Sequence, residues 1–326
     1  MKKSEEIKLN LQKSKFNKKK MNENDLKYYI EKHKELYDNV QDSFSVLLEK
    51  SNVNDEQLVV ISQAIKENTT LTELDLSNNK FKNKGMKFFC ESLKTNTTIQ
   101  SLNLSFNKFG DKGILFLSDS LKINSSLKRL DLMGNTNITK HGLKIFIETL
   151  KINCSISALD LSNNYMSDDE LKIILNNLKF NSSIKKIFIR KNNFQNEGMI
   201  YLSGFLKTNS TIEEIDFSKN LVKSEGIRRI CDSLVLNTTL KVLNLSENNV
   251  TKNVDDSIFK TLSYNYSLTD FNVESIEKKE NLKKRNDNLL KENLENPEKA
   301  KLRVEENLKR SKLIKQFYFS FLFLVQ

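Results

Sequence analysis

The chain has 326 residues, a formal net charge of +11 and a single proline. The excess positive charge lies at its two ends, because residues 1–20 hold eight Lys and two Glu, and residues 277–315 hold thirteen Lys or Arg and eight Asp or Glu. The segment between them is neutral overall, and the basic runs lack interleaved aromatic residues, so we expect no nucleic-acid partner. The charged ends are either solvated or dock to an acidic protein surface.

Residues 1–22 form a Lys-rich arm without an apolar run, which we expect to be disordered. The arm does not resemble a secretory signal, so a cytoplasmic protein is expected. Three cysteines agree with a reducing compartment, and Cys90 and Cys231 occupy one repeat position beside apolar residues, as small core residues would. A metal site or catalytic thiol would need His or acidic partners, but His33 and His141 lie far apart in the sequence.

The next segment, residues 23–42, is predicted to be a capping helix. Apolar residues from Leu26 to Val40 recur there at helical spacing, and His33 lies in the same stripe. The end of a repeat stack exposes apolar surface and needs a cover. His33 is therefore expected to be a packed residue of the cap and not a ligand.

A repeated motif dominates the rest of the chain. Residues Leu71–Asn79 read L-T-E-L-D-L-S-N-N, and the frame L-x-x-L-x-L-x-x-N returns every 28 residues, or once after 29. It starts again at Ile99, Leu127, Ile156, Ile184, Ile212 and Leu240, and at Leu268 without its final Asn. Residues 43–51 fit a degenerate opening repeat, and the repeat segment is placed at 43–286. The single extra residue lies within 134–140.

Each repeat is expected to contain a strand, a turn and a helix. In the strand, Leu74 and Leu76 point inward while Asp75 points outward, because side chains alternate along an extended chain. The closing Asn79 and its equivalents are expected to satisfy backbone groups of the turn. The helix that follows commonly opens with a Gly and closes with an Asn, which we attribute to a left-handed helix end.

Strands of the form L-x-x-L-D-L-S-N-N, a 28-residue period and helices of the form G-x-x-x-L-x-x-x-L-x-x-N resemble ribonuclease-inhibitor-type leucine-rich repeats. The resemblance implies an α/β fold, a right-handed horseshoe solenoid with a parallel inner sheet, outer helices and helical flanks. We expect about eight strands, starting near residue 46. The family includes inhibitors, Ran-type GTPase activators, actin pointed-end capping proteins, axonemal subunits and innate-immune sensors, so it does not fix a function.

Beyond residue 286 the period is lost. Residues 287–326 are predicted to form a charged helical extension, interrupted by Pro297, with an apolar tail. The tail at 317–325 is uncharged and shorter than the ~20 residues of a membrane span. Three interpretations stay open, namely an end cap or docking segment, a gene-model artefact and a membrane tail. A membrane is not the expected partner.

No pattern in the sequence indicates catalysis, because it holds no nucleophile and base pair, phosphate-binding Gly loop or metal-ligand spacing. We expect no enzymatic activity, no cofactor and no small-molecule substrate. The leading hypothesis is a scaffold that binds a protein partner in a cytoskeletal or ciliary assembly. One alternative is a Ran-type GTPase activator, although the chain lacks a long loop insertion and an acidic tail. The other is an actin pointed-end capping protein.

The concave strand face is the expected partner surface. Most repeats carry Asp or Asn at the strand centre and Ser two residues later, whereas the repeat starting at Ile184 carries basic and aromatic residues. Aromatic, Met and Arg side chains are enriched in interfaces. The candidate partner-binding residues are Phe106, Arg129, Met133, Lys186, Phe188, Arg190 and Lys191. The alternative is that Phe188 reflects neutral drift, sheltered by neighbouring side chains.

Overall fold

The computed structural model describes residues 22–250, 254–265 and 267–273, and residues 288, 291, 295, 296, 298 and 302. Its strands are β1 Ser45–Leu47, β2 Glu73–Asp75, β3 Ser101–Asn103, β4 Arg129–Asp131, β5 Ala158–Asp160, β6 Lys186–Phe188, β7 Glu214–Asp216, β8 Val242–Asn244 and β9 Asp270–Asn272. Its helices are α2 Glu23–Lys32, α3 Lys34–Gln41, α4 Asp55–Glu67, α5 Asn83–Thr95, α6 Asp111–Leu121, α7 Lys140–Thr149, α8 Asp168–Leu178, α9 Asn196–Leu206, α10 Ser224–Leu234 and α11 Asp255–Tyr264. Residues 1–21 of the arm predicted at 1–22 and residues 274–286 of the predicted solenoid lie outside the described residues. So do the apolar tail and the helical extension, apart from those isolated residues.

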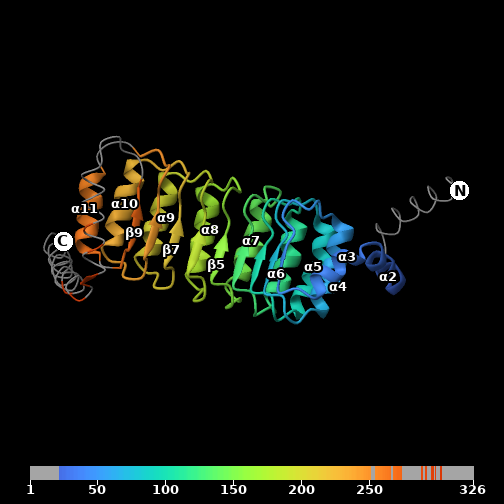
Figure 1. Cartoon of the computed structure of the whole chain (residues 1–326). Helices are drawn as coiled ribbons and strands as arrows, with labels where there is room; N and C mark the ends of the chain where they lie inside the picture. The colour runs from blue at the N-terminus through green and yellow to red at the C-terminus, as the bar shows by residue number, and fades with distance from the viewer. Residues whose placement is uncertain are drawn as a thin grey trace.

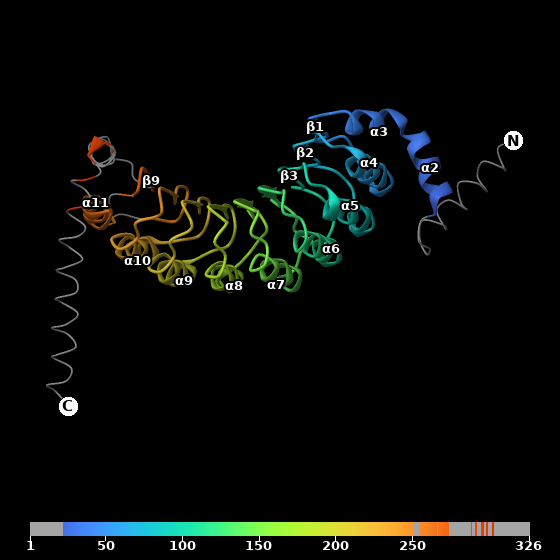
Figure 2. The same cartoon turned by 90° about the horizontal axis from the view of Figure 1, so that it is seen from below.

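Within this described part, nine strands form one parallel sheet in chain order from β1 to β9. Leu74 pairs with Leu102, one period later, and the same register continues along the sheet. Helices α4 to α11 cover one face of the sheet, and the stack is curved with the strands on its inner side (Figures 1 and 2). The predicted solenoid is confirmed. It has nine strands and not about eight, because the repeat starting at Leu268 also contributes one.

The hydrophobic core lies between the strand layer and the helix layer. Leu74 and Leu76 of the strand and Phe89 of α5 are fully buried, as the alternation and the helical spacing predict. Equivalent residues in the other repeats continue one buried cluster from Val40 to Phe271. Because each repeat covers the apolar faces of its neighbours, the core is shared along the stack.

The asparagine that closes each repeat motif, here called the turn asparagine, holds neighbouring turns together. Asn107 Nδ2 donates to the carbonyl of Leu104 at 3.0 Å in its own turn and to that of Leu76 at 2.9 Å in the preceding repeat. Its backbone N–H donates to Asn135 Oδ1 at 3.1 Å in the following repeat. The predicted structural column is confirmed. Its members are Asn79, Asn107, Asn135, Asn164, Asn192, Asn220 and Asn248.

The asparagines at the helix ends also bridge repeats, and the left-handed conformation predicted for them is wrong. Asn96 has φ −70° and ψ 128°, which is extended. Its Oδ1 accepts from the backbone N–H of Ile99 at 2.9 Å, and its Nδ2 donates to the carbonyl of Ile65 at 2.9 Å. The amide therefore begins the next repeat and ties it to the previous helix, a role that requires both a donor and an acceptor.

The glycines near the helix starts are explained by the preceding helix. Asp55 is the first residue of α4, and its Oδ1 accepts from the backbone N–H of Gly85 at 3.0 Å. A Cβ on Gly85 would lie 2.9 Å from that oxygen. One helix therefore caps the next, and the contact is close enough to leave no room for a side chain.

Residues 23–42 form two helices and not the single helix predicted. Asn22 caps α2 by accepting from the backbone N–H of Asp25 at 2.9 Å, so this residue belongs to the cap and not to the arm. The break falls at His33, between α2 and α3, and Val40 of α3 joins the core. His33 is partly buried, burial lowers its pKa, and its Nε2 has no hydrogen-bond partner among the described residues.

Candidate partner-binding site

Polar side chains form a strand-centre column on the concave face. Asp75 Oδ1 accepts from the backbone N–H of Ser77 at 2.8 Å, and Asp160 Oδ1 accepts from that of Ser162 at 2.8 Å. These bonds satisfy backbone N–H groups where each strand ends. The recurring Asp or Asn at the strand centre therefore has a structural role. Ser77 and Ser162 are buried, so the serines of this pattern are not exposed on the concave face. The column comprises Asp75, Asn103, Asp131, Asp160, Phe188, Asp216, Asn244 and Asn272.

Phe188 interrupts this column. It lies in register between Asp160 of β5 and Asp216 of β7, and its side chain is partly buried instead of exposed. The backbone N–H of Arg190 has no strand-centre oxygen to bind and donates instead to Ser162 Oγ at 3.2 Å. A hydroxyl of the preceding repeat therefore replaces the missing acceptor, which allows an aromatic ring to occupy a carboxylate position.

A cavity of about 260 Å³ opens on the concave face around this ring. It is called the strand cavity here. Arg129 of β4 and Arg190, which follows β6, line it together with Phe188, so three of the seven predicted residues converge. The remaining lining residues are aliphatic or acidic. They are Leu130, Asp131, Ala158, Leu159, Asp160 and Asp216.

The other four predicted residues lie outside the lining of the strand cavity. Lys186 opens β6 and pairs with Glu214 of β7, with 2.7 Å between Nζ and Oε2. Lys191 and Phe106 occupy the same exposed position after the strand, with left-handed φ values of 53° and 52°. The backbone N–H of Phe106 donates to the carbonyl of Met133 at 2.8 Å, so these two residues are neighbours at the strand ends.

The repeats match a known protein family. The family described as "Leucine Rich repeat" matches residues 67–90, 95–118, 124–144 and 236–253, which are parts of four of the repeats seen in the structure. The chain therefore contains leucine-rich repeats. No curated protein matches it.

Solved structures similar to this leucine-rich-repeat protein include "Leiomodin-1 Actin-Binding Site 2 (ABS2)", at 20% identity and a TM-score of 0.43, over 50% of this chain and 95% of that chain. The tropomodulin C-terminal domain from Caenorhabditis elegans is similar at 11% identity and a TM-score of 0.43. That match covers 50% of this chain and 98% of that chain.

The strand cavity of the leucine-rich-repeat protein is strongly polarised. Burial and then the neighbouring carboxylate of Asp160 raise the pKa of Asp131 to about 6, although the N–H of Met133 and the Arg129 guanidinium act in the opposite direction. Burial also raises the pKa of Asp160. Arg129 and Arg190 are exposed and form no ion pair within 4 Å among the described residues. Their guanidinium groups are therefore available to an incoming partner.

The described residues include three free cysteines, which differ in exposure. Cys90 and Cys231 are buried, as predicted, and burial raises the pKa of both thiols, to about 11 for Cys231. A protonated thiol is a poor nucleophile at neutral pH. Cys154 is exposed. The part of the chain that the structure describes contains no group of His, Cys, Asp and Glu that could hold a metal ion. None of its helices has the length and apolar character needed to cross a bilayer.

Asp131, Asp160 and Asp216 were not among the predicted site residues. They repeat with the strand period, so the sequence shows them as ordinary members of a regular column. The signal that could have identified them is their pairing position beside Phe188, because a fixed 28-residue register places neighbours in the sheet one period apart.

Proposed function

We propose that this chain is a non-enzymatic scaffold that binds a protein partner on its concave strand face, with the strand cavity as the centre of the interface. The observation that carries the proposal is the convergence of Arg129, Phe188 and Arg190 on one cavity of about 260 Å³. Curved solenoids present extended concave surfaces of this kind. Aromatic and Arg side chains that fill pockets near the centre of an interface contribute most of its binding energy.

The charges of the cavity indicate what such a partner presents. Two exposed guanidinium groups flank a floor that carries Asp131 and Asp160, so complementary acidic groups suit the rim and an apolar or polar uncharged group suits the floor. Arg binds a carboxylate through two parallel hydrogen bonds, which fixes orientation as well as adding energy. A partner segment with an acidic residue beside an apolar one fits this arrangement.

A cytoplasmic location and a role in a cytoskeletal or ciliary assembly are the finer parts of the proposal. They rest on the resemblance of the motif to repeat proteins of those assemblies. The absence of a catalytic arrangement in the described residues supports a binding role. Nucleic acid, a membrane and a small-molecule substrate are not part of this proposed function.

The experiment compares the proteins retained by the full chain with those retained by the Phe188→Ala and Arg190→Ala variants, in extracts of the native cell. A direct partner identified this way is then titrated by calorimetry against each purified variant. Each substitution should weaken binding by about 2 kcal/mol, the scale of an interface hot spot, and leave the melting temperature unchanged. Glu73→Ala is the control, since Glu73 is exposed on β2, far along the sheet from Phe188.

Equal losses from Glu73→Ala and Phe188→Ala would contradict an interface centred on the strand cavity. Two activity assays separate the alternatives suggested by the family. Stimulation of GTP hydrolysis by Ran, or inhibition of actin elongation at pointed ends, would favour the corresponding alternative over the scaffold. The scaffold proposal predicts no effect in either assay.

A further inference from the structure

A column of large apolar residues runs through the turns, two residues after most turn asparagines. Phe81 and Phe109 are stacked, with 6.1 Å between ring centroids. Phe194 packs on Phe217, a core residue that directly follows β7 and lies outside the column, at 5.0 Å. Between Phe109 and Phe194 the column holds Ile138 and Met166, and after Phe194 it holds Val222 and Val250. Two successive positions without a ring therefore separate Phe109 from Phe194.

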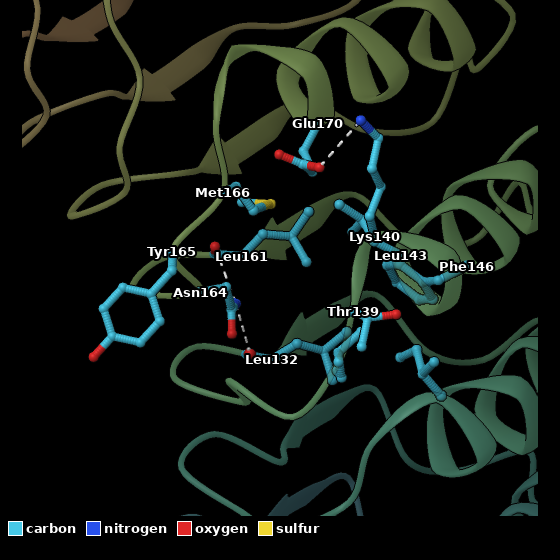
Figure 3. Close-up of a pocket in the computed structure, with 12 residues that line it drawn as sticks. Leu132, Thr139, Lys140, Leu143, Phe146, Leu161, Asn164, Tyr165, Met166 and Glu170 are labelled. Carbon is cyan, nitrogen blue, oxygen red and sulfur yellow. Dashed lines mark hydrogen bonds and ion pairs between the residues drawn. The ribbon is translucent and has the colours of Figure 1, made fainter.

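A second cavity, the inter-repeat cavity, lies at this interruption. Its volume is about 200 Å³, and Ile138, Leu143, Phe146, Leu161 and Met166 provide apolar lining. Figure 3 shows the labelled side chains around it, which come from the segments that follow β4 and β5 and from α7 and α8. The full lining is Ile114, Leu132, Ile138, Thr139, Lys140, Leu143, Phe146, Leu161, Asn164, Tyr165, Met166 and Glu170.

The single inserted residue of the chain accounts for this cavity. In three regular repeats, the backbone N–H of the column residue donates to the next turn asparagine, as Met166 does to Asn192 Oδ1 at 3.1 Å. In the repeat with the insertion, Ile138 lies three residues after Asn135, and its N–H donates to the carbonyl of Asn135 at 3.0 Å instead. The Oδ1 atom of Asn164 is buried without a partner among the described residues, as is that of Asn107 after a regular repeat. The insertion thus removes Ile138 from the regular stack.

The cavity is open to solvent. The exposed fractions of Leu143 and Met166 are 6% and 5%. Phe194, which holds the column position in the next repeat, is 0% exposed. Tyr165 at the lining is 68% exposed. Lys140 is paired with Asp169 at 2.8 Å, so the cation on the lining is already neutralised. A ligand that enters needs apolar surface and no charge.

We propose that the inter-repeat cavity binds a small uncharged aromatic molecule. An apolar cavity of about 150 Å³ is known to accept benzene, so the space here accommodates a fused ring of the size of indole. The ring replaces the phenylalanine side chains that neighbouring repeats place in the same column. Met166 offers a polarisable sulfur, which makes favourable contacts with aromatic rings. This site is separate from the strand cavity and does not depend on the proposed function.

The test uses indole and the full chain. Because the chain contains no tryptophan, indole fluorescence excited above the tyrosine band reports its own environment without background. We expect a saturable shift of the emission to shorter wavelength and a rise in melting temperature with indole concentration. The cavity-filling variants Ile138→Phe and Met166→Phe restore a ring to the column, and either should reduce indole affinity at least tenfold.

Ile152→Phe is the matched control. Ile152 is 61% exposed in the turn after α7, so the same chemical change there should alter indole affinity less than twofold. The use of two filling variants keeps the test valid if one of them fails to fold. The proposal is overturned if wild-type chain causes no saturable shift, or if a folded filling variant binds indole as tightly as the wild type does.

Discussion

Asn83 Oδ1 accepts hydrogen bonds from the backbone N–H groups of both Gly110 and Gly113, each at 2.9 Å. The side chain therefore caps a helix that belongs to the following repeat. A Cβ on Gly113 would lie 2.9 Å from this same oxygen and 2.7 Å from the Cβ of Phe109. The absence of a side chain at Gly113 is thus a condition for the contact between α5 and α6.

Gly113→Ala should lower the free energy of unfolding by about 2 kcal/mol, because an added methyl group overpacks the contact between the helices. Gly204→Ala is the matched control, since Gly204 also lies within a helix and no atom of the described neighbourhood lies within 4 Å of its Cβ position. That change should raise stability by about 0.5–1 kcal/mol through helix propensity. Urea unfolding of both variants shows whether each change raises or lowers the free energy of unfolding. Two shifts of the same sign would contradict the close contact.

Asn192 is expected to be one of the most sensitive polar residues in the stack. Its Oδ1 accepts from the backbone N–H groups of Asn164 and Met166, at 3.0 and 3.1 Å, and its Nδ2 donates to the carbonyl of Ile189 at 3.1 Å. Asn192→Ala leaves these buried groups unpaired and should cost about 3 kcal/mol. Asn193→Ala, at the adjacent exposed position, should cost less than about 1 kcal/mol. Comparable losses in urea unfolding would argue against the column of turn asparagines as a source of stability.

The raised pKa of Asp131 predicts a dependence of stability on pH. Folding moves this pKa from an ordinary value of 3.8 to about 6, chiefly by burial and then by Asp160, so the folded chain binds the proton more tightly. Ionisation therefore removes stability as the pH rises from about 4 to about 6. Asp131→Asn keeps an Oδ1 acceptor for the N–H of Met133 and should stabilise the chain by about 2 kcal/mol at pH 8.

The gain from Asp131→Asn should shrink as the pH falls and vanish near pH 3, below both pKa values, where the wild-type carboxyl is protonated in the folded and the unfolded state. Asn103→Asp is the reverse change in the same column. It places a carboxylate between Asp75 and Asp131 and removes the bond from Asn103 Nδ2 to Asp75 Oδ2 at 3.0 Å. This variant should lose stability at pH 8 and recover part of it at pH 4. A gain from Asp131→Asn that is independent of pH would exclude ionisation as its cause.

The regular parts of the fold were predictable because the same apolar and polar residues recur at the same positions in each repeat. The 28-residue period located the strands, and the spacing of Leu74, Leu76 and Phe89 identified the core. The turn asparagines were also assigned correctly, since a polar residue at a fixed place after a strand has backbone groups to satisfy. For the candidate site, Phe188, Arg129 and Arg190 line one cavity, and their role in partner binding stays a prediction.

The parts that were missed depend on contacts between repeats. Asn96 was assigned a left-handed helix end because its partner, the carbonyl of Ile65, lies 31 residues earlier and is invisible in a single repeat. Asp160 was overlooked because only the parallel register places it beside Phe188. The inserted residue before Lys140 was seen, but the loss of a phenylalanine pair at Ile138 and Met166 was not connected with it. Local sequence patterns therefore predicted the strands and helices of each repeat. The contacts between neighbouring repeats could be identified only in the structure.

The bonds between turn asparagines join each repeat only to the ones before and after it. Removing or duplicating one whole unit of 28 residues, such as residues 184–211, would present the same donors and acceptors at the new junction. Genetic change in steps of one unit can therefore lengthen or shorten the concave surface without redesign of the core. An insertion of a single residue does not preserve these donors and acceptors. In the repeat that holds the insertion, the contact between neighbouring turns is changed, and this one contact can vary without a change in the rest of the stack.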